Sequence, residues 1–197
     1  KQALIELTPD PSVLQQPVTE QSFATATAPL WQWYDAIKPH LWRAGKSFPE
    51  NESIQQQMLS DGELDIAMAF DPAAAAAGIA SGQLPPSARV FVPNQGTLGN
   101  ISFVAIPYNA SHTAGAKVVA NFLLRPETQA HMQNIYVLGS FSVLDPSKLN
   151  TQQNQTFAAL PTSDALPTLT DLGPTLLEPH ASWTNKLKQH WSQRYSQ

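Results

Sequence analysis

The stretch from residue 51 to residue 80 constrains the fold of this chain more than any other part of its sequence. It begins with a polar segment in which Asn51 or Ser53 can cap a helix that runs through Leu59, and Gly62 can end that helix. The mostly apolar run 64–70 comes next, and its length is typical of a buried strand in a parallel sheet. Asp71 and Pro72 then provide a favourable start for another helix. Helix, strand and helix in this order predict an α/β fold.

Helices and short strands continue to alternate along the rest of the chain. An amphipathic helix is expected to begin at Pro29, because apolar residues recur after it at the spacing of one helix face: Leu30, Trp33, Tyr34, Ile37 and Leu41. Trp33 and Tyr34 are therefore expected in the core. The other expected elements are strands over 89–92 and 101–106, a helix that ends at 124, and helices that begin near 126 and 182.

Composition excludes several classes of function. The net charge is −4 with a pI of about 5.7, and the sequence has no cluster of Lys and Arg, so no nucleic-acid partner is expected. Cysteine is absent, which rules out disulfides, thiol catalysis and cysteine-bound metal clusters. The five histidines lack the spacing of a metal motif, and no G-x-S-x-G motif occurs. We therefore expect no metal, no cofactor and no enzymatic activity.

Three segments carry a resemblance to a known family. The segment 62–70 reads Gly-Glu-Leu-Asp-Ile-Ala-Met-Ala-Phe, the segment 96–107 ends in Ile-Pro, and the segment 114–129 contains Phe-Leu-Leu-Arg-Pro-Glu-Thr-Gln. In this order and at this spacing they resemble the type II periplasmic solute-binding proteins that feed ABC importers. The segments 39–49 and 137–145 look like those of the YnjB-like branch of this family.

The resemblance implies a three-layer α/β/α fold of the periplasmic-binding-protein type II class. It implies that the chain corresponds to the C-terminal portion of such a protein, with the second lobe and part of the first. Residues 1–92 would form a second-lobe α/β segment, and 93–107 would be the hinge-crossing segment. Residues 108–197 would return to the first lobe and end in the C-terminal helices.

The same resemblance implies a function. Such proteins are extracytoplasmic components of ABC importers, here expected in the periplasm, and they capture a small polar solute in a cleft between two lobes. Their partners are the solute itself and the permease subunits of the transporter. Closure around the solute is a hinge motion, and no bond is made or broken.

Two candidate ligand-binding residues stand where the expected strand 64–70 ends and the next helix begins. Ligands of open α/β sheets favour this place, and the resemblance puts it at the cleft. Phe70 would stack on the solute, and Asp71 would accept a hydrogen bond or pair with a cation. The alternative is that Phe70 is a core residue and Asp71 only a helix cap.

Four further candidates come from the hinge-crossing segment and from the aromatic cluster near residue 31. Asn100 and Ser102, with Thr97 nearby, occupy positions that the resemblance places beside the solute. Polyamine-binding relatives have Trp and Asp at two of these positions, so a polyamine solute is not expected. The alternative is that these are ordinary loop residues. Trp31 falls off the apolar stripe of its helix, and we expect it to face a cleft or a partner.

Other classes of function remain open from the sequence. One is an enzyme on a related two-lobe scaffold, since a fold does not fix a function. Another is a carbohydrate-binding module that uses exposed tryptophans. The sequence also predicts a homodimer or domain swap of this chain, because an incomplete sheet has unpaired edge strands that can pair with another copy.

Overall fold

The computed structural model describes residues 1–93, 95–168 and 170–195, and these divide into two compact units. Unit 1 comprises Lys1–Glu50, Val92–Gly99 and Leu169–Gln197, and unit 2 comprises Asn51–Phe91 and Asn100–Thr168. Each of the expected segments 1–92 and 108–197 is thus shared between both units. The expected hinge-crossing segment 93–107 contains a passage from unit 1 to unit 2, at Gly99 and Asn100.

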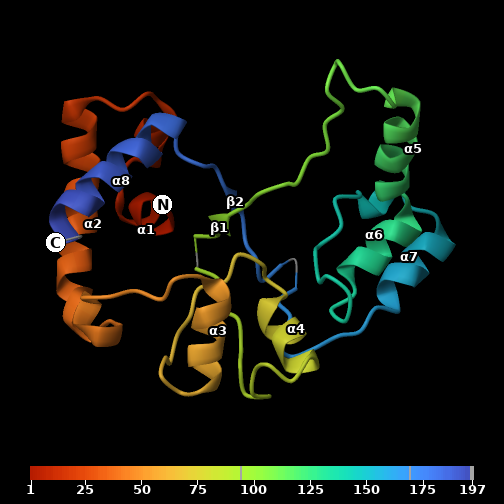
Figure 1. Cartoon of the computed structure of the whole chain (residues 1–197), viewed down its shortest axis with the longest axis horizontal. Coiled ribbons are helices and arrows are strands. Elements are labelled where there is room, and N and C mark those ends of the chain that lie inside the picture. Colours follow the sequence, from red (N-terminus) through yellow and green to blue (C-terminus); the bar gives the residue numbers. More distant parts are fainter. Residues whose placement is uncertain (94, 169, 196–197) are drawn as a thin grey trace. The chain divides into compact units, whose positions relative to one another are not determined.

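Unit 1 is built mainly from helices (Figure 1). Its elements are α1 (Gln2–Leu7), the 3-10 helices η1 (Pro11–Gln15), η2 (Lys38–His40) and η3 (Trp42–Gly45), α2 (Glu20–Ile37), β1 (Thr97–Leu98), β2 (Thr175–Leu176) and α8 (Ala181–Tyr195). Its core holds the buried residues Leu4, Ile5, Leu14, Phe23, Ala26, Trp31 and Trp183. Trp183 anchors α8 in this core, because its indole N–H also donates a hydrogen bond to the carbonyl of Gln16 (2.9 Å).

Helix α2 begins nine residues before the expected start at Pro29, so that expectation is wrong. Thr19 caps the helix: its side chain accepts from the backbone N–H of Ser22, and the Ser22 hydroxyl oxygen accepts from the Thr19 N–H, both at 3.0 Å. The earlier start brings Phe23 and Ala26 onto the buried face, together with Thr27, Trp31 and Tyr34.

This shift of the buried face of α2 changes the roles of its tryptophans. Tyr34 is buried, as expected. Trp33 is 41% exposed, so the expectation that it is a core residue is wrong, while Trp31 is only 8% exposed. The physical reason is that α8 packs along the side of α2 that carries Trp31, as the contact between the rings of Trp31 and Tyr195 shows.

Two short parallel strands join separate parts of unit 1. Thr97 pairs with Thr175 and Leu98 with Leu176. The side chain of Gln2 supports β1 from α1, since its amide donates to the Gly96 carbonyl (3.0 Å) and accepts from the Leu98 N–H (3.1 Å). The candidate Thr97 is therefore half-buried in a small sheet.

Unit 2 contains six helical segments (Figure 1). They are α3 (Glu52–Ser60), α4 (Ala74–Ala80), α5 (Thr113–Leu123), α6 (Pro126–Gln133), the 3-10 helix η4 (Pro146–Lys148) and α7 (Thr151–Ala158). Its buried cluster consists of Ala75, Ala76, Leu84, Ile135 and Ala165. The close packing of α4 requires Gly78, because a Cβ there would lie 2.7 Å from Cδ1 of Leu84.

Strands were expected over 64–70, 89–92 and 101–106, and the structure has none there. Among the described residues, the strands are β1 and β2. Ile66 and Met68 are each 71% exposed. A strand needs a neighbouring strand to pair its backbone, and the residues described here supply none. The expectation of a buried strand at 64–70 is therefore wrong for this chain. The three-layer α/β/α arrangement stays a prediction.

Among the described helices, none combines the length and the apolar character needed to span a bilayer.

Candidate functional site

A pocket in unit 2 contains one of the predicted ligand-binding residues. Its volume is about 580 Å³, and it lies beside α3 and α4. Polar residues at its wall are Glu52, Gln56, Asp71, Ser81, Gln83 and Tyr136, and the apolar part of the lining includes Ala73, Ala77 and Ile135. The lining contains two carboxylates and no Lys, Arg or His side chain among the described residues.

Asp71 occupies the turn that leads into α4. Its Oδ1 accepts a hydrogen bond from the N–H of Ala73 (2.8 Å), and its backbone carbonyl accepts from the N–H of Ala74 (3.0 Å). The N-cap of α4 is Ala73, so the side chain of Asp71 stabilises the turn before the helix and is not the cap itself. Oδ2 of Asp71 has no hydrogen-bond partner among the residues that the structure describes. One carboxylate oxygen is thus available at the pocket wall.

The second carboxylate of this pocket belongs to Glu52, which lies in the first turn of α3. Its Oε1 accepts from the N–H of Phe70 and from the side-chain amide of Gln56, both at 3.4 Å. The neighbouring Gln55 accepts from the N–H of Met68 (3.3 Å). These contacts attach the segment before Asp71 to α3. This attachment of the segment 68–70 to α3 therefore brings the carboxylates of Asp71 and Glu52 to one pocket.

The chemistry of this pocket is that of a hydrogen-bond acceptor site with negative charge. Two half-buried carboxylates without a cationic neighbour in the lining attract a positively charged group. The amides of Gln56 and Gln83 and the phenol of Tyr136 add donors and acceptors. An uncharged apolar ligand would leave these groups without partners, which costs free energy.

The other predicted residues of unit 2 lie outside this pocket. Phe70 is 92% exposed, so the alternative that it is a core residue is wrong, and its ring is free to contact a solute or a partner. Asn100 and Ser102 are exposed. The side-chain oxygen of Asn100 accepts from the N–H of Ile101 (2.9 Å), which is the behaviour of a loop residue.

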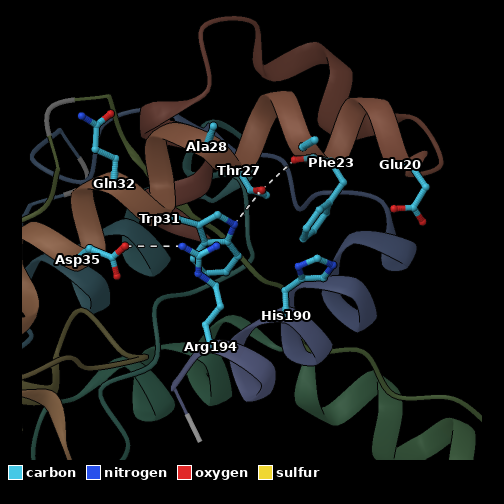
Figure 2. Close-up of a pocket in the computed structure, with 10 residues that line it drawn as sticks. Glu20, Phe23, Thr27, Ala28, Trp31, Gln32, Asp35, His190 and Arg194 are labelled. Carbon is cyan, nitrogen blue, oxygen red and sulfur yellow. Dashed lines mark hydrogen bonds and ion pairs between the residues drawn. The ribbon is translucent and has the colours of Figure 1, made fainter.

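Trp31 lines a different pocket, in unit 1, with a volume of about 590 Å³ (Figure 2). Its indole N–H donates to the hydroxyl of Thr27 (2.9 Å), and that hydroxyl donates to the Phe23 carbonyl (2.8 Å). The guanidinium of Arg194 lies 5.5 Å from the centre of the Trp31 ring. Nη2 of Arg194 also lies 3.7 Å from Oδ2 of Asp35. The polar atom and one face of the indole are thus engaged by α2 and α8 themselves.

The remaining charges of the unit 1 pocket are also paired within the protein. Glu20 on α2 forms an ion pair with Lys186 on α8, and this hydrogen-bonded lysine holds the pKa of the Glu20 carboxyl below its usual range. The ring of His190 lies 4.5 Å from that of Phe23. This pocket is therefore a groove along the packing interface of α2 and α8. The unit 2 pocket is the better candidate for binding.

Sequence reasoning missed Glu52, Gln56 and Tyr136. Glu52 looks like an ordinary acidic residue in the first turn of a helix, where the helix dipole favours it. Tyr136 lies in a loop after α6 and belongs to no motif. Their convergence on Asp71 depends on tertiary structure. The described residues contain no group of three His, Asp or Glu side chains that could hold a metal ion.

Comparison with known proteins gives one informative match. The chain is 45% identical to Protein YnjB of Escherichia coli (strain K12) over 195 residues, which is 99% of this chain. Over that length the chain is YnjB-like. This confirms the YnjB-like resemblance read from the sequence. The YnjB-like chain spans about half the length of this relative (48%).

No family model and no solved structure matches the YnjB-like chain.

Proposed function

We propose that this YnjB-like chain is part of the solute-binding component of an ABC importer, located in the periplasm. The pocket beside Asp71 binds a small, polar and positively charged solute, which is then passed to the permease subunits. The observation that carries this proposal is that Asp71 and Glu52 both line one pocket whose described lining has no basic side chain.

Three arguments support the proposal. The ordered segments 62–70, 96–107 and 114–129 resemble those of solute-binding proteins. The free oxygen of Asp71 offers a charge-assisted hydrogen bond, which is stronger than a neutral one. The pocket lacks a nucleophile hydrogen-bonded to a general base among its described residues, so its chemistry favours binding over turnover.

The experiment is thermal unfolding of the full chain in the presence of small organic cations and of uncharged compounds with the same shape. Trimethylammonium and guanidinium compounds would be compared with their neutral carbon and urea analogues. A cation at 100 times its Kd is expected to add about 2.7 kcal/mol to the free energy of unfolding. The neutral analogues are expected to have little effect.

A matched pair of variants connects this stabilisation to the pocket. Asp71→Asn is expected to weaken cation binding at least tenfold, and Asp65→Asn is expected to leave it unchanged, because Asp65 is an exposed acid of the same unit outside the lining. An equal loss of cation binding in both variants would also contradict the proposal, because it would show that only the overall charge of the protein matters. Unchanged binding in Asp71→Asn would contradict the proposal.

A further inference from the structure

The turn that follows α2 collects positive charge in a protein that is acidic as a whole. Lys38, Arg43 and Lys46 lie within nine residues, and no acidic residue occurs between Asp35 and Glu50. The net charge of the whole chain is −4. Three cations in nine residues do not make a nucleic-acid motif, but they give this basic turn (residues 38–46) a charge opposite to that of the rest of the protein.

The fold of η2 and η3 brings the cations of the basic turn together. The Lys38 carbonyl accepts from the N–H of Leu41 (3.1 Å). The Arg43 carbonyl accepts from the N–H of Lys46 (3.2 Å), so the segment makes two tight turns. Gly45 lies against the Lys38 side chain, because a Cβ at Gly45 would be only 2.6 Å from Cγ of Lys38. The two ends of the basic turn are therefore neighbours in space.

The charges of the basic turn are not neutralised within the protein. Ion pairs elsewhere involve four other basic residues, Lys1, Arg125, Lys186 and Arg194. Within the part of the chain that the structure describes, Lys38, Arg43 and Lys46 form no ion pair, and the last two are exposed. Asp35, the acid that precedes the turn, already accepts a hydrogen bond from the Tyr195 hydroxyl (2.6 Å). The three cations are thus available to an anionic partner.

Aromatic rings lie directly beside two of these cations. The guanidinium carbon of Arg43 is 4.2 Å from the centre of the Trp42 ring, and Trp42 is half-buried. Nζ of Lys38 is 5.0 Å from the centre of the Tyr195 ring. A cation over an aromatic face keeps its charge and is attracted to the ring. The basic turn therefore presents paired cationic and aromatic groups.

An exposed phenylalanine lies in the same region of unit 1. Phe48 is 46% exposed, and its ring is 5.7 Å from that of Trp191. Trp191 in turn contacts Tyr195, at 4.8 Å between ring centres, and Tyr195 is the residue over which Lys38 lies. Aromatic side chains with cations beside them are typical of surfaces that bind in the headgroup layer of a membrane.

We propose that the basic turn, together with Phe48, docks unit 1 on a membrane surface that contains anionic lipids. Lys38, Arg43 and Lys46 are attracted to the lipid phosphates, and Trp42 and Phe48 enter the interfacial layer. None of these residues lines either of the two pockets described above, which suits a flat partner better than an inserted peptide. The inference does not depend on which solute the protein binds.

The test is co-sedimentation of the full chain with lipid vesicles. Vesicles of phosphatidylcholine alone are compared with vesicles of equal parts phosphatidylcholine and phosphatidylglycerol. Binding is expected to be at least tenfold stronger to the anionic vesicles, and to be lost at about 1 M salt, where the Debye length falls to about 3 Å. Equal binding to both kinds of vesicle, or no binding to the anionic ones, would overturn the proposal.

Variants connect the binding to the basic turn. Arg43→Gln and Lys46→Gln are each expected to weaken binding to anionic vesicles about fivefold, and together roughly 25-fold. Both side chains are exposed, so the circular dichroism is expected to stay unchanged. The matched control combines Lys117→Gln with Lys148→Gln, which removes two exposed cations from unit 2. An equal loss in both double variants would show that only net charge matters and would contradict the proposed surface.

The aromatic part of the surface has its own readout. Transfer of Trp42 into the headgroup layer is expected to shift the tryptophan emission to shorter wavelength when anionic vesicles are added, and Trp42→Phe is expected to reduce this shift. An unchanged shift in that variant would contradict the placement of Trp42.

An acidic protein is the alternative partner for the basic turn, and polyglutamate is the probe for it. Binding of polyglutamate that is weakened by Arg43→Gln and Lys46→Gln, without binding of anionic vesicles, would assign the surface to an acidic protein and overturn the proposal.

Discussion

At the scale of single residues, the hydroxyl of Tyr34 is the most unusual polar group in the core of unit 1. It is buried and has no hydrogen-bond partner among the described residues, while its ring makes edge contacts with Trp191 and Tyr195 at 4.6 and 4.7 Å between ring centres. A buried hydroxyl without a partner costs about 1–3 kcal/mol. The ring of Tyr34 therefore stabilises the core and its oxygen opposes that contribution.

Replacing Tyr34 by phenylalanine is expected to raise the free energy of unfolding by about 1 kcal/mol, because the ring contacts remain and the desolvation cost disappears. Urea unfolding monitored by tryptophan fluorescence measures this. Tyr195→Phe is the matched control. It removes a hydrogen bond from the Tyr195 hydroxyl to Asp35 (2.6 Å) and is expected to destabilise. Loss of stability in Tyr34→Phe would show that the hydroxyl has a partner.

The same tyrosines predict a loss of stability at alkaline pH. Burial raises the pKa of both Tyr34 and Tyr195 above the ordinary value of 10.0. Above that value the unfolded chain binds fewer protons than the folded one, so the free energy of unfolding falls as the pH rises. Urea unfolding at pH 8 and at pH 10.5 is expected to show this decrease, and Tyr34→Phe is expected to reduce it. An equal decrease in the variant would exclude Tyr34 as a cause.

Asp71 shows how far residue-level reasoning from sequence reaches. Its place between an apolar run and a helix predicted a position at a binding pocket, and it does line one. That it binds a solute there stays a prediction. The partners that complete this pocket could not be predicted, because Glu52 and Tyr136 are distant in sequence and only the packing of α3 and of the loop after α6 brings them near. Trp31, which was expected to face a cleft or a partner from its place off the apolar stripe, lies on the buried face of α2 and lines the unit 1 pocket.

At the scale of elements, local signals located helices better than strands. The helix expected after Asn51 is α3, and Asn51 caps it by accepting from the N–H of Ile54 (3.0 Å). Such a cap needs only neighbours in sequence. A strand depends on a distant partner, and the segments 64–70 and 101–106 have none among the described residues. Their apolar patterns are those of strands, yet the residues present cannot pair them.

The turn at η3 contains two residues in an unfavourable backbone conformation. Arg43 and Ala44 have φ of 50° and 52°, in the left-handed region. A non-glycine residue there costs about 1 kcal/mol or more. Ala44→Gly is therefore expected to stabilise the protein by about 1 kcal/mol in urea unfolding. Ala24→Gly, at an exposed position in the interior of α2, is the control and is expected to destabilise by about 1 kcal/mol.

Gly96 is required by the small parallel sheet. Its φ is +98°, and a Cβ there would lie 2.0 Å from the Pro174 carbonyl oxygen. Gly96→Ala is expected to lower the free energy of unfolding by more than 1 kcal/mol, since both the backbone conformation and the pairing of β1 with β2 are disturbed. Gly115→Ala is the control, because that glycine lies in α5 with nothing within 4 Å, and alanine favours the helix. Equal stability of Gly96→Ala and the parent would contradict this role.

At the scale of the whole molecule, the chain passes repeatedly between two compact units. Unit 1 gathers the two ends of the sequence with the short segment around β1, and unit 2 holds the pocket with Asp71. This interleaving could not be derived from the sequence, which favoured consecutive segments. The separate placement of Asp71 and Trp31 in two units assigns them different roles, a candidate ligand residue and a packing residue between α2 and α8.

Equilibrium dialysis of the folded protein against a cell extract, followed by mass spectrometry of the retained small molecules, tests the central claim most directly. We expect one small cationic solute to be retained at one molecule per chain and to be lost from Asp71→Asn but kept by Asp65→Asn. Retention of no small molecule, or retention that is the same in both variants, would contradict the assignment of a solute-binding pocket at Asp71.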